Sequence, residues 1–136
     1  MRHFVDPSLA VAAVRATPAR LLGDVSWLGL LFENLVVRDL RVYAQALDAM
    51  VFAYRDETGL EADAVIEMPD GRWAAFEVKL GLREVDAAAE HLLRLKTRID
   101  TAVAGEPLAL GVITATGYGY VREDGVAVIP IGALTA

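Results

Sequence analysis

Two long segments of the chain place apolar residues at steps of three and four, a pattern typical of amphipathic helices. One segment runs from residue 24 or 26 to about residue 47, and the other from residue 85 to about residue 103, where Gly105 and Pro107 stop it. A shorter helix is predicted to open at Asp6-Pro7-Ser8 and to continue to about Ala16. The pattern therefore predicts two long helices separated by a region of different periodicity.

That intervening region alternates polar and apolar residues with a period of two, which is typical of strands. Strands are predicted over residues 50–55, 60–68 and 73–80. They are joined by short polar connections, and Pro69-Asp70-Gly71-Arg72 is a strong turn signal. Three strands with such short connections predict an antiparallel meander.

The end of the chain adds further strands. The continuous apolar run at residues 108–113 suits a strand that is buried on both faces and pairs in parallel with a neighbour. Residues 120–122 and 126–130 predict a C-terminal hairpin. The core order is helix, strand, strand, strand, helix, strand, so we expect one α/β domain over residues 1–136, with a central mixed sheet flanked by helices.

Composition narrows the class of protein. A chain of 136 residues with 55% hydrophobic and 24% charged residues is long enough for a globular core, and it has no cysteines for disulfides or thiolate metal sites. No segment approaches ~18 uninterrupted apolar residues, so we expect no membrane span and a cytoplasmic location. The net charge of -6 argues against tight, sequence-independent binding of nucleic acid by the whole surface. It leaves open a local basic patch, or an acidic pocket whose charge a metal ion cancels.

The candidate chemistry lies on the second and third predicted strands. Strand alternation places Glu77 and Lys79 on one face of the third strand. In the second strand it places Glu61, Asp63 and Val65 on one face, and Ala62, Ala64 and Ile66 on the other. Asp63 and Glu77 then become near neighbours across the turn. The alternative interpretation is an ordinary solvated face of a meander.

Two flanking helices must both pack on this small sheet, so we expect these acids to be covered. A covered, uncompensated charge costs several kcal/mol, and a divalent cation would offset that cost. Asp63, Glu77 and the carbonyl of Val78 could hold Mg²⁺ or Mn²⁺, which prefer oxygen ligands. Lys79 could orient or deprotonate a water molecule, or contact a scissile phosphate. Glu33, at the margin of the apolar stripe of the first long helix, is the helical candidate; its alternative is a solvated edge residue.

Several motifs resemble one uncharacterised domain of prokaryotic proteins, in which it follows a P-loop AAA-type ATPase module. Phe4-Val5-Asp6-Pro7-Ser8-Leu9-Ala10 is similar to its opening, and Gly29-Leu30-Leu31-Phe32-Glu33-Asn34-Leu35-Val36 to its helix. Tyr54-Arg55-Asp56, Glu61-Ala62-Asp63 and Phe76-Glu77-Val78-Lys79 look like its strand motifs. The resemblance covers nearly the whole chain in the right order.

The resemblance implies a restriction-endonuclease-like fold of the PD-(D/E)XK nuclease superfamily, whose core is αβββαβ. It implies Asp63 and Glu77 as metal ligands, Lys79 as the catalytic lysine and Glu33 as the helix acid. It also implies an ATPase partner in cis or in trans, because this chain has no phosphate loop of its own. DNA is the expected nucleic-acid partner, and the sequence leaves the choice between DNA and RNA as substrate open. An excised domain would expose apolar surface, so a homo-oligomer would be unsurprising.

The later helix supplies candidate contacts to nucleic acid. Arg83, Arg94 and Arg98 could contact a phosphate backbone, but basic residues are also favourable near a helix C-terminus. This helix reads Glu90-His91-Leu92-Leu93-Arg94 and lacks the Gln-x-x-x-Tyr signature of some related nucleases. We therefore carry two hypotheses: a Mg²⁺-dependent nuclease or nuclease-derived module, and an inactive nuclease fold that serves as an interaction or regulatory domain.

Overall fold

The computed structural model describes residues 23–134, so the predicted helix of residues 6–16 and the opening motif at residues 4–10 lie outside the described residues. The described chain begins with the long helix α3 (Val25–Gln45) and continues through the strands β1 (Met50–Arg55), β2 (Glu61–Glu67) and β3 (Trp73–Lys79). After a 3-10 turn, Leu82–Glu84, come the helices α4 (Val85–Arg98) and α5 (Thr101–Ala104). The strands β4 (Ala109–Thr114), β5 (Tyr120–Val121) and β6 (Ala127–Pro130) follow, and a second 3-10 turn, Ile131–Ala133, ends the fold.

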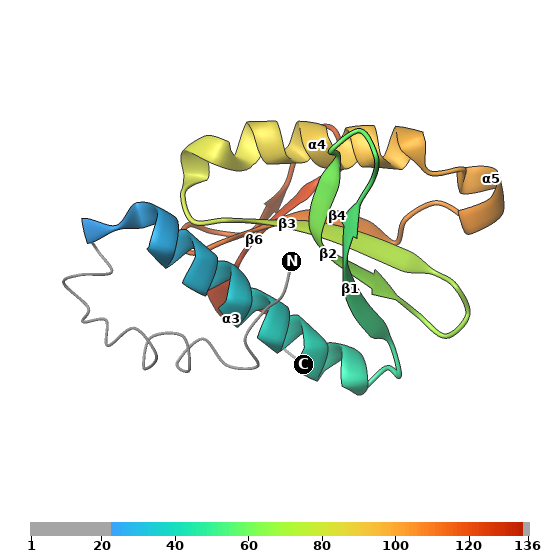
Figure 1. Ribbon diagram of the computed structural model, residues 1–136, viewed down its shortest axis with the longest axis horizontal. Coiled ribbons are helices and arrows are strands. Elements are labelled where there is room, and N and C mark those ends of the chain that lie inside the picture. Colours follow the sequence, from blue (N-terminus) through green and yellow to red (C-terminus); the bar gives the residue numbers. More distant parts are fainter. Residues whose placement is uncertain (1–22, 135–136) are drawn as a thin grey trace.

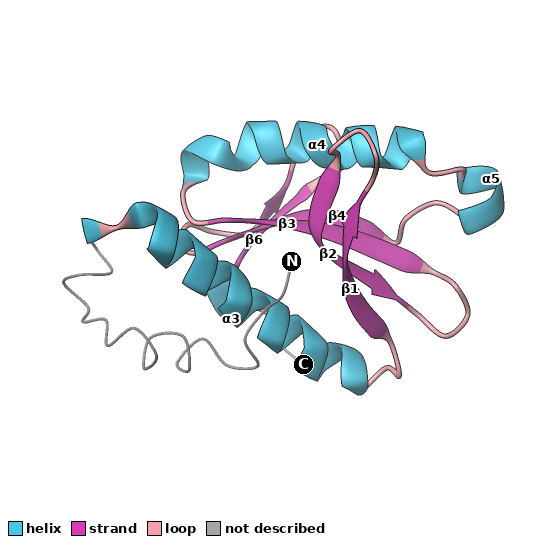
Figure 2. Ribbon diagram, viewed as in Figure 1, coloured by secondary structure: helices cyan, strands magenta, loops and turns pink. Residues whose placement is uncertain are grey.

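The strands form one six-stranded mixed sheet in the order β1-β2-β3-β4-β6-β5 (Figure 2). The predicted antiparallel meander of β1, β2 and β3 is confirmed. Strand β4 pairs in parallel with both β3 and β6, and β5 pairs with β6 as the predicted C-terminal hairpin. The predicted order of helix, three strands, helix and strand is therefore confirmed, and the fold is a mixed α/β sheet flanked by helices.

Helices α3 and α4 cover opposite faces of the sheet (Figure 1). Beneath α3, Phe32, Val36 and Leu40 pack with Val78 and Ile113. Beneath α4 lies the second cluster of buried residues, which includes Ala75, Ala88, Leu92, Leu95, Leu110 and Val112. Both faces of the central strands are thus apolar, which explains why residues 108–113 read as an uninterrupted apolar run.

The second long helix is shorter than predicted, because the helical pattern over residues 85–103 breaks in two. Ile99 takes an extended conformation, with φ -80° and ψ 132°, and ends α4. The carboxylate of Asp100 then accepts a hydrogen bond from the backbone N–H of Ala102 at 3.0 Å and caps α5. An aspartate favours such a cap over a place inside a helix, and the apolar spacing alone does not reveal that preference.

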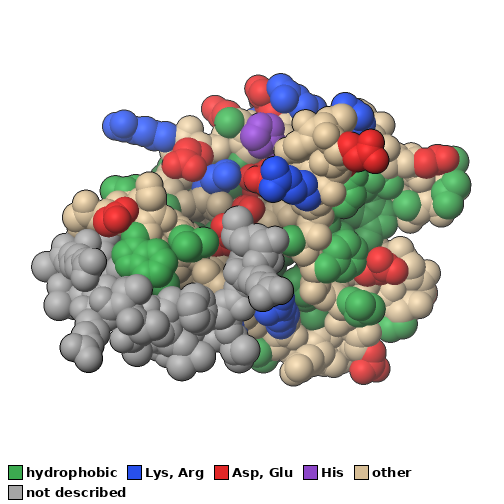
Figure 3. All heavy atoms as spheres, viewed as in Figure 1, with side chains coloured by type: hydrophobic (Ala, Val, Ile, Leu, Met, Phe, Trp, Pro, Cys, Tyr) green, Lys and Arg blue, Asp and Glu red, His purple; other side chains and the backbone are tan. Residues whose placement is uncertain are grey.

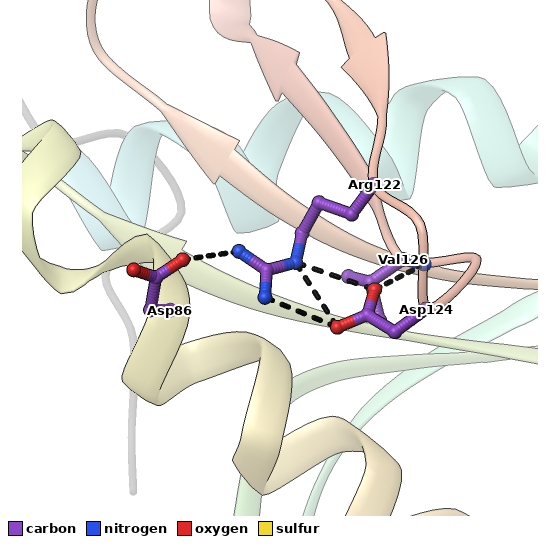
Figure 4. Close-up of polar contacts among 4 residues, drawn as sticks. All are labelled: Asp86, Arg122, Asp124 and Val126. Atoms are coloured by element: carbon purple, nitrogen blue, oxygen red, sulfur yellow. Dashed lines mark hydrogen bonds and ion pairs between the residues drawn. The ribbon is translucent and has the colours of Figure 1, made fainter.

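Arg122 ties the C-terminal hairpin to the start of α4 (Figure 4). Its guanidinium donates hydrogen bonds to both carboxylate oxygens of Asp124 and also to Asp86 in the first turn of α4. The Arg122 hydrogen bonds hold the pKa of Asp124 below its usual range. The carboxylate of Asp124 also accepts from the N–H of Val126 at 3.1 Å, so the hairpin turn and α4 are fixed to each other.

No helix within residues 23–134 combines the length and the apolar character needed to cross a membrane.

Candidate functional site

A β-bulge in β2 turns the backbone at Asp63. In the pairing of β1 with β2, Phe52 faces Val65 and Tyr54 faces Ala62, so that two residues of β2, Asp63 and Ala64, oppose the single residue between Phe52 and Tyr54. Such an extra residue redirects side chains and is common beside active sites. The prediction of simple alternation in β2 is therefore wrong: Ala62 and Val65 pack beneath α4, whereas Ala64 packs beneath α3.

The sheet also splits next to this bulge. The described ladder between β2 and β3 ends at the pair Ala64 and Phe76, although β3 continues beside β4 as far as Lys79. At the split, the carboxylate of Asp63 accepts a hydrogen bond from the backbone N–H of Val78 at 2.7 Å. A side-chain oxygen thus takes the place that a strand carbonyl would have had, and it fixes Asp63 against β3.

Glu77 is buried at the same place, with only 4% of its side chain exposed. One of its carboxylate oxygens lies 3.1 Å from Nζ of Lys79, and the other lies 3.5 Å from Nδ1 of His91 in α4. The structure therefore places Glu77 in a covered position and not on a solvated face of the meander.

A cavity of about 490 Å³ opens above the split. Its walls carry charge of both signs, from Glu61, Asp63, Glu77, Lys79, Arg94 and Arg98. The turn between β1 and β2, at Thr58–Leu60, closes one side, and α4 closes the other. Figure 3 shows acidic, basic and histidine side chains gathered on this face of the molecule.

The electrostatic environment of the cavity raises the pKa of Glu77. Burial raises the pKa of Glu77, and the negative charge of Asp63 adds to that effect, while Lys79 opposes it. Burial lowers the pKa of Lys79, but the combined attraction of Glu77, Asp63 and Glu84 outweighs burial and leaves the pKa above its usual value. Lys79 is therefore a cation at neutral pH, and the two acids repel each other across the split.

Glu33 reaches the same region from α3. It lines a smaller cavity, of about 70 Å³, together with Asp63 and Glu61. Burial, and next the negative charge of Asp63, raise the pKa of Glu33 to about 7. Because Lys79 and Glu77 also influence this pKa, the helix acid and the strand residues belong to one electrostatic cluster.

Residues 28–134 match the family model described as "Domain of unknown function (DUF4143)". The chain belongs to the DUF4143 family. Neither the search of curated proteins nor the search of solved structures returned a match. The matched range contains every candidate site residue of this DUF4143 domain.

The structure brings most of the predicted site residues together. Asp63, Glu77 and Lys79 share the larger cavity, while Glu33 shares the smaller one with Asp63. Of the predicted basic residues, Arg94 and Arg98 line the larger cavity. Arg83 lies in the 3-10 turn before α4 and is not among the described residues that line it.

Sequence reasoning missed His91, because a single histidine has no partner at a metal-like spacing. His91, Arg94 and Arg98 are nevertheless spaced by three and four residues, so that they form one stripe of α4 beside its buried stripe. That spacing was a signal that all three side chains face the same cavity of the DUF4143 domain.

The donor atoms at the split are oxygens, the type of ligand that hard divalent cations prefer. Asp63 and Glu77 supply carboxylates, and the Val78 carbonyl lies between Glu77 and Lys79 in the chain. Within residues 23–134, no group of three or more His, Cys, Asp or Glu side chains is arranged to hold a metal ion. Any cation held here would therefore keep water molecules, as Mg²⁺ commonly does with one or two carboxylates.

Proposed function

We propose that this DUF4143 domain is a metal-dependent phosphodiesterase of the restriction-endonuclease-like PD-(D/E)XK type, or a nucleic-acid-processing module derived from one. The observation that supports the proposal is the split between β2 and β3, where Asp63 and Glu77 approach each other beside Lys79 in a charged cavity. The helix–strand order fits that fold class. The motif resemblance favours an AAA-type ATPase as its partner, in cis or in trans.

The acids at the split have the chemistry to bind a cation. Asp63 and Glu77, with the Val78 carbonyl, would hold Mg²⁺ or Mn²⁺. When bound, such an ion acidifies a water molecule and stabilises negative charge that develops on a phosphate. Burial raises the pKa of Glu77 and the negative charge of Asp63 adds to that effect, and a cation held by both carboxylates would offset their repulsion.

The remaining residues have distinct roles in this proposal. Lys79, a cation beside Glu77, would position the attacking water or the scissile phosphate. Glu33, with a pKa of about 7, could accept or donate a proton at neutral pH. Arg94 and Arg98 line the opposite wall of the cavity and would attract a phosphate backbone, which we propose to be that of DNA.

Cleavage assays with purified protein test this function. Labelled DNA and RNA, single-stranded and duplex, are incubated with Mg²⁺ or Mn²⁺. We expect metal-dependent cleavage that falls by about 100-fold or more in Lys79→Ala and Asp63→Ala. Lys96→Ala is the matched control, because Lys96 lies on the same helix as Arg94 but pairs with Glu106 at 2.7 Å. Cleavage that persists in both site variants would contradict the assignment.

One observation favours a second function. Both carboxylate oxygens of Glu77 lie near groups of the protein itself, Lys79 and His91. An inactive nuclease fold could keep this internal network and serve as an interaction or regulatory module of the ATPase. In that case no cleavage and no Mn²⁺ binding would be measured. Glu77→Ala would then show whether the ion pairs of Glu77 are structural. The variant protein loses stability if they are, and keeps it if they are dispensable.

A further inference from the structure

The charged cavity above the split is a slot between two walls. One wall is the turn between β1 and β2, which is held by its own hydrogen bonds: the Asp56 carboxylate accepts from the N–H groups of Thr58 and Leu60 and from the Thr58 hydroxyl. The other wall is α4, which contributes Thr97 and Arg98. Figure 1 shows the turn reaching the level of α4. A ligand must therefore pass between the turn and the helix to reach the acids.

The size of this slot limits the form of nucleic acid that can enter it. The cavity has a volume of about 490 Å³, and Glu77 in its lining has only 4% of its side chain exposed. Pockets that hold one small ligand have volumes of about 300 to 1,000 Å³, and one nucleotide with its phosphate is a ligand of that class. A double helix is much larger, since its major groove alone is about 12 Å wide and about 8.5 Å deep.

Two arginines on α4 supply positive charge to the slot. Within the described part of the chain, Arg98 forms no ion pair. Arg94 lies 3.9 Å from Glu90, but both side chains are 67% exposed, so solvent screens that pair. Lys96, by contrast, lies 2.7 Å from the carboxylate of Glu106. Both arginines are therefore available to bind phosphate oxygens, which a guanidinium group can contact through two parallel hydrogen bonds.

The spacing of these arginines suits a single strand of nucleic acid. Arg94 and Arg98 are four residues apart, which is about one helical turn, or about 6 Å along the axis of α4. Successive phosphates of one extended strand have a similar spacing. His91, beside Glu77, lies about one turn before Arg94 on the same stripe. A strand that follows α4 would therefore place one phosphate at the split and the next two at the arginines.

We propose that the slot binds one strand of nucleic acid, and that a duplex enters it only where its strands have separated. The inference rests on the proposed function for the position of the scissile phosphate, between the two acids and Lys79. The next two phosphates of the strand contact Arg94 and Arg98. The net charge of -6 agrees with this arrangement, because an acidic surface opposes the many phosphate contacts by which proteins hold a duplex.

Fluorescence anisotropy without divalent metal tests the proposal separately from cleavage. The probes are a labelled DNA strand of about 12 nucleotides that cannot fold on itself, and the same strand in a duplex. We expect the single strand to bind about 10-fold or more tightly than the duplex, because only the single strand reaches both arginines. Equal affinity for the two probes, tighter binding of the duplex, or no binding of the single strand overturns the proposal.

The salt dependence of the same binding counts the phosphates in the slot. Two phosphates on a single strand predict that log K falls with log salt concentration with a slope of about -1.4. Arg98→Ala should reduce the size of this slope by about 0.7 and weaken binding about 5-fold or more at low salt, whereas Arg98→Lys should keep the slope. Lys96→Ala is the matched control on the same helix and should change neither quantity. Circular dichroism verifies that each variant is folded, and an unchanged slope in Arg98→Ala would contradict this path for the strand.

Cleavage of a tailed duplex separates this inference from the proposed function. The substrate is a DNA duplex with a single-stranded tail, incubated with Mg²⁺ or Mn²⁺, and we expect cuts within the tail. Cuts in the paired region at an equal rate would overturn the single-strand inference and leave the nuclease assignment standing. No cleavage in either region, together with preferential binding of the single strand, would contradict the nuclease and support the slot as a binding site for one strand.

Discussion

The two halves of the β2–β3 pair satisfy the hydrogen-bonding groups of their backbones in different ways. In one half, Glu67 to Ala64 pair with Trp73 to Phe76 through the strand ladder. In the other half, β2 bulges at Asp63 and β3 runs on beside β4, and the Asp63 carboxylate accepts from the N–H of Val78. The paired half lies under apolar residues of α4, such as Leu92, whereas the split half lines a charged cavity.

This contrast separates stability from chemistry within one hairpin. Apolar side chains above the paired half stabilise the fold by leaving water. The split half instead gathers acids whose ionised forms are disfavoured by burial and mutual repulsion, as the raised pKa of Glu77 and that of Glu33 indicate. Such unfavourable ionisation is expected at a site where a bound ligand, and not the folded protein alone, offsets the charge.

The largest effect on stability should come from the paired half. Leu92 is 1% exposed and packs in the cluster beneath α4. Leu92→Ala should therefore lower the free energy of unfolding by about 3 kcal/mol, through lost burial and the cavity left behind. Its neighbour Leu93 is only partly buried, so Leu93→Ala should cost about half as much or less. Urea denaturation followed by circular dichroism measures both, and equal losses would contradict the contrast.

Two substitutions at Asp63 test whether its carboxylate supports the split half. Asp63→Ala leaves the N–H of Val78 without this acceptor, while Asp63→Asn keeps an oxygen there and removes the charge. We expect Asp63→Ala to be less stable than Asp63→Asn by about 1 kcal/mol. The same denaturation experiment without metal measures this difference in the free energy of unfolding. Equal stability of the two variants would show that the hydrogen bond contributes little.

A third effect, confined to pH values above about 4.5, is the pH dependence contributed by Glu33. Its pKa is about 7 in the folded protein, against 4.5 for an ordinary glutamate, so the folded state binds the proton more tightly. Stability should therefore fall as pH rises from about 4.5 through 7, and then level off. Glu33→Gln should remove this slope and, with allowance for solvent screening, stabilise the protein by about 1 kcal/mol at pH 8 but not at pH 4.

Thermal denaturation at pH 4, 6 and 8 measures the Glu33 effect. Glu57→Gln, in the exposed turn after β1, is the control and should leave the slope unchanged. An unchanged slope in Glu33→Gln would mean that burial and Asp63 do not raise this pKa in solution.

Sequence periodicity predicted α3, the beginning of α4, the meander, the strand of residues 108–113 and the terminal hairpin, because each depends on local pattern. It did not predict the end of α4 at Arg98. The bulge at Asp63 could not be predicted, since it depends on the register between β1 and β2 and the sequence there holds no glycine or proline to mark it. His91 shows the other limit: it approaches Glu77 from a different element, and only packing of α4 on the sheet brings the two together.

We propose that Asp63 and Glu77 hold one divalent cation at the split. Paramagnetic broadening of amide NMR signals by substoichiometric Mn²⁺ tests it most directly, since broadening falls steeply with distance from the ion. We predict that the amide signals of Asp63, Val78 and Lys79 broaden first, and that the selective effect disappears in Asp63→Asn and in Glu77→Gln. Broadening centred on exposed acids elsewhere, or unchanged in both variants, would contradict the metal site.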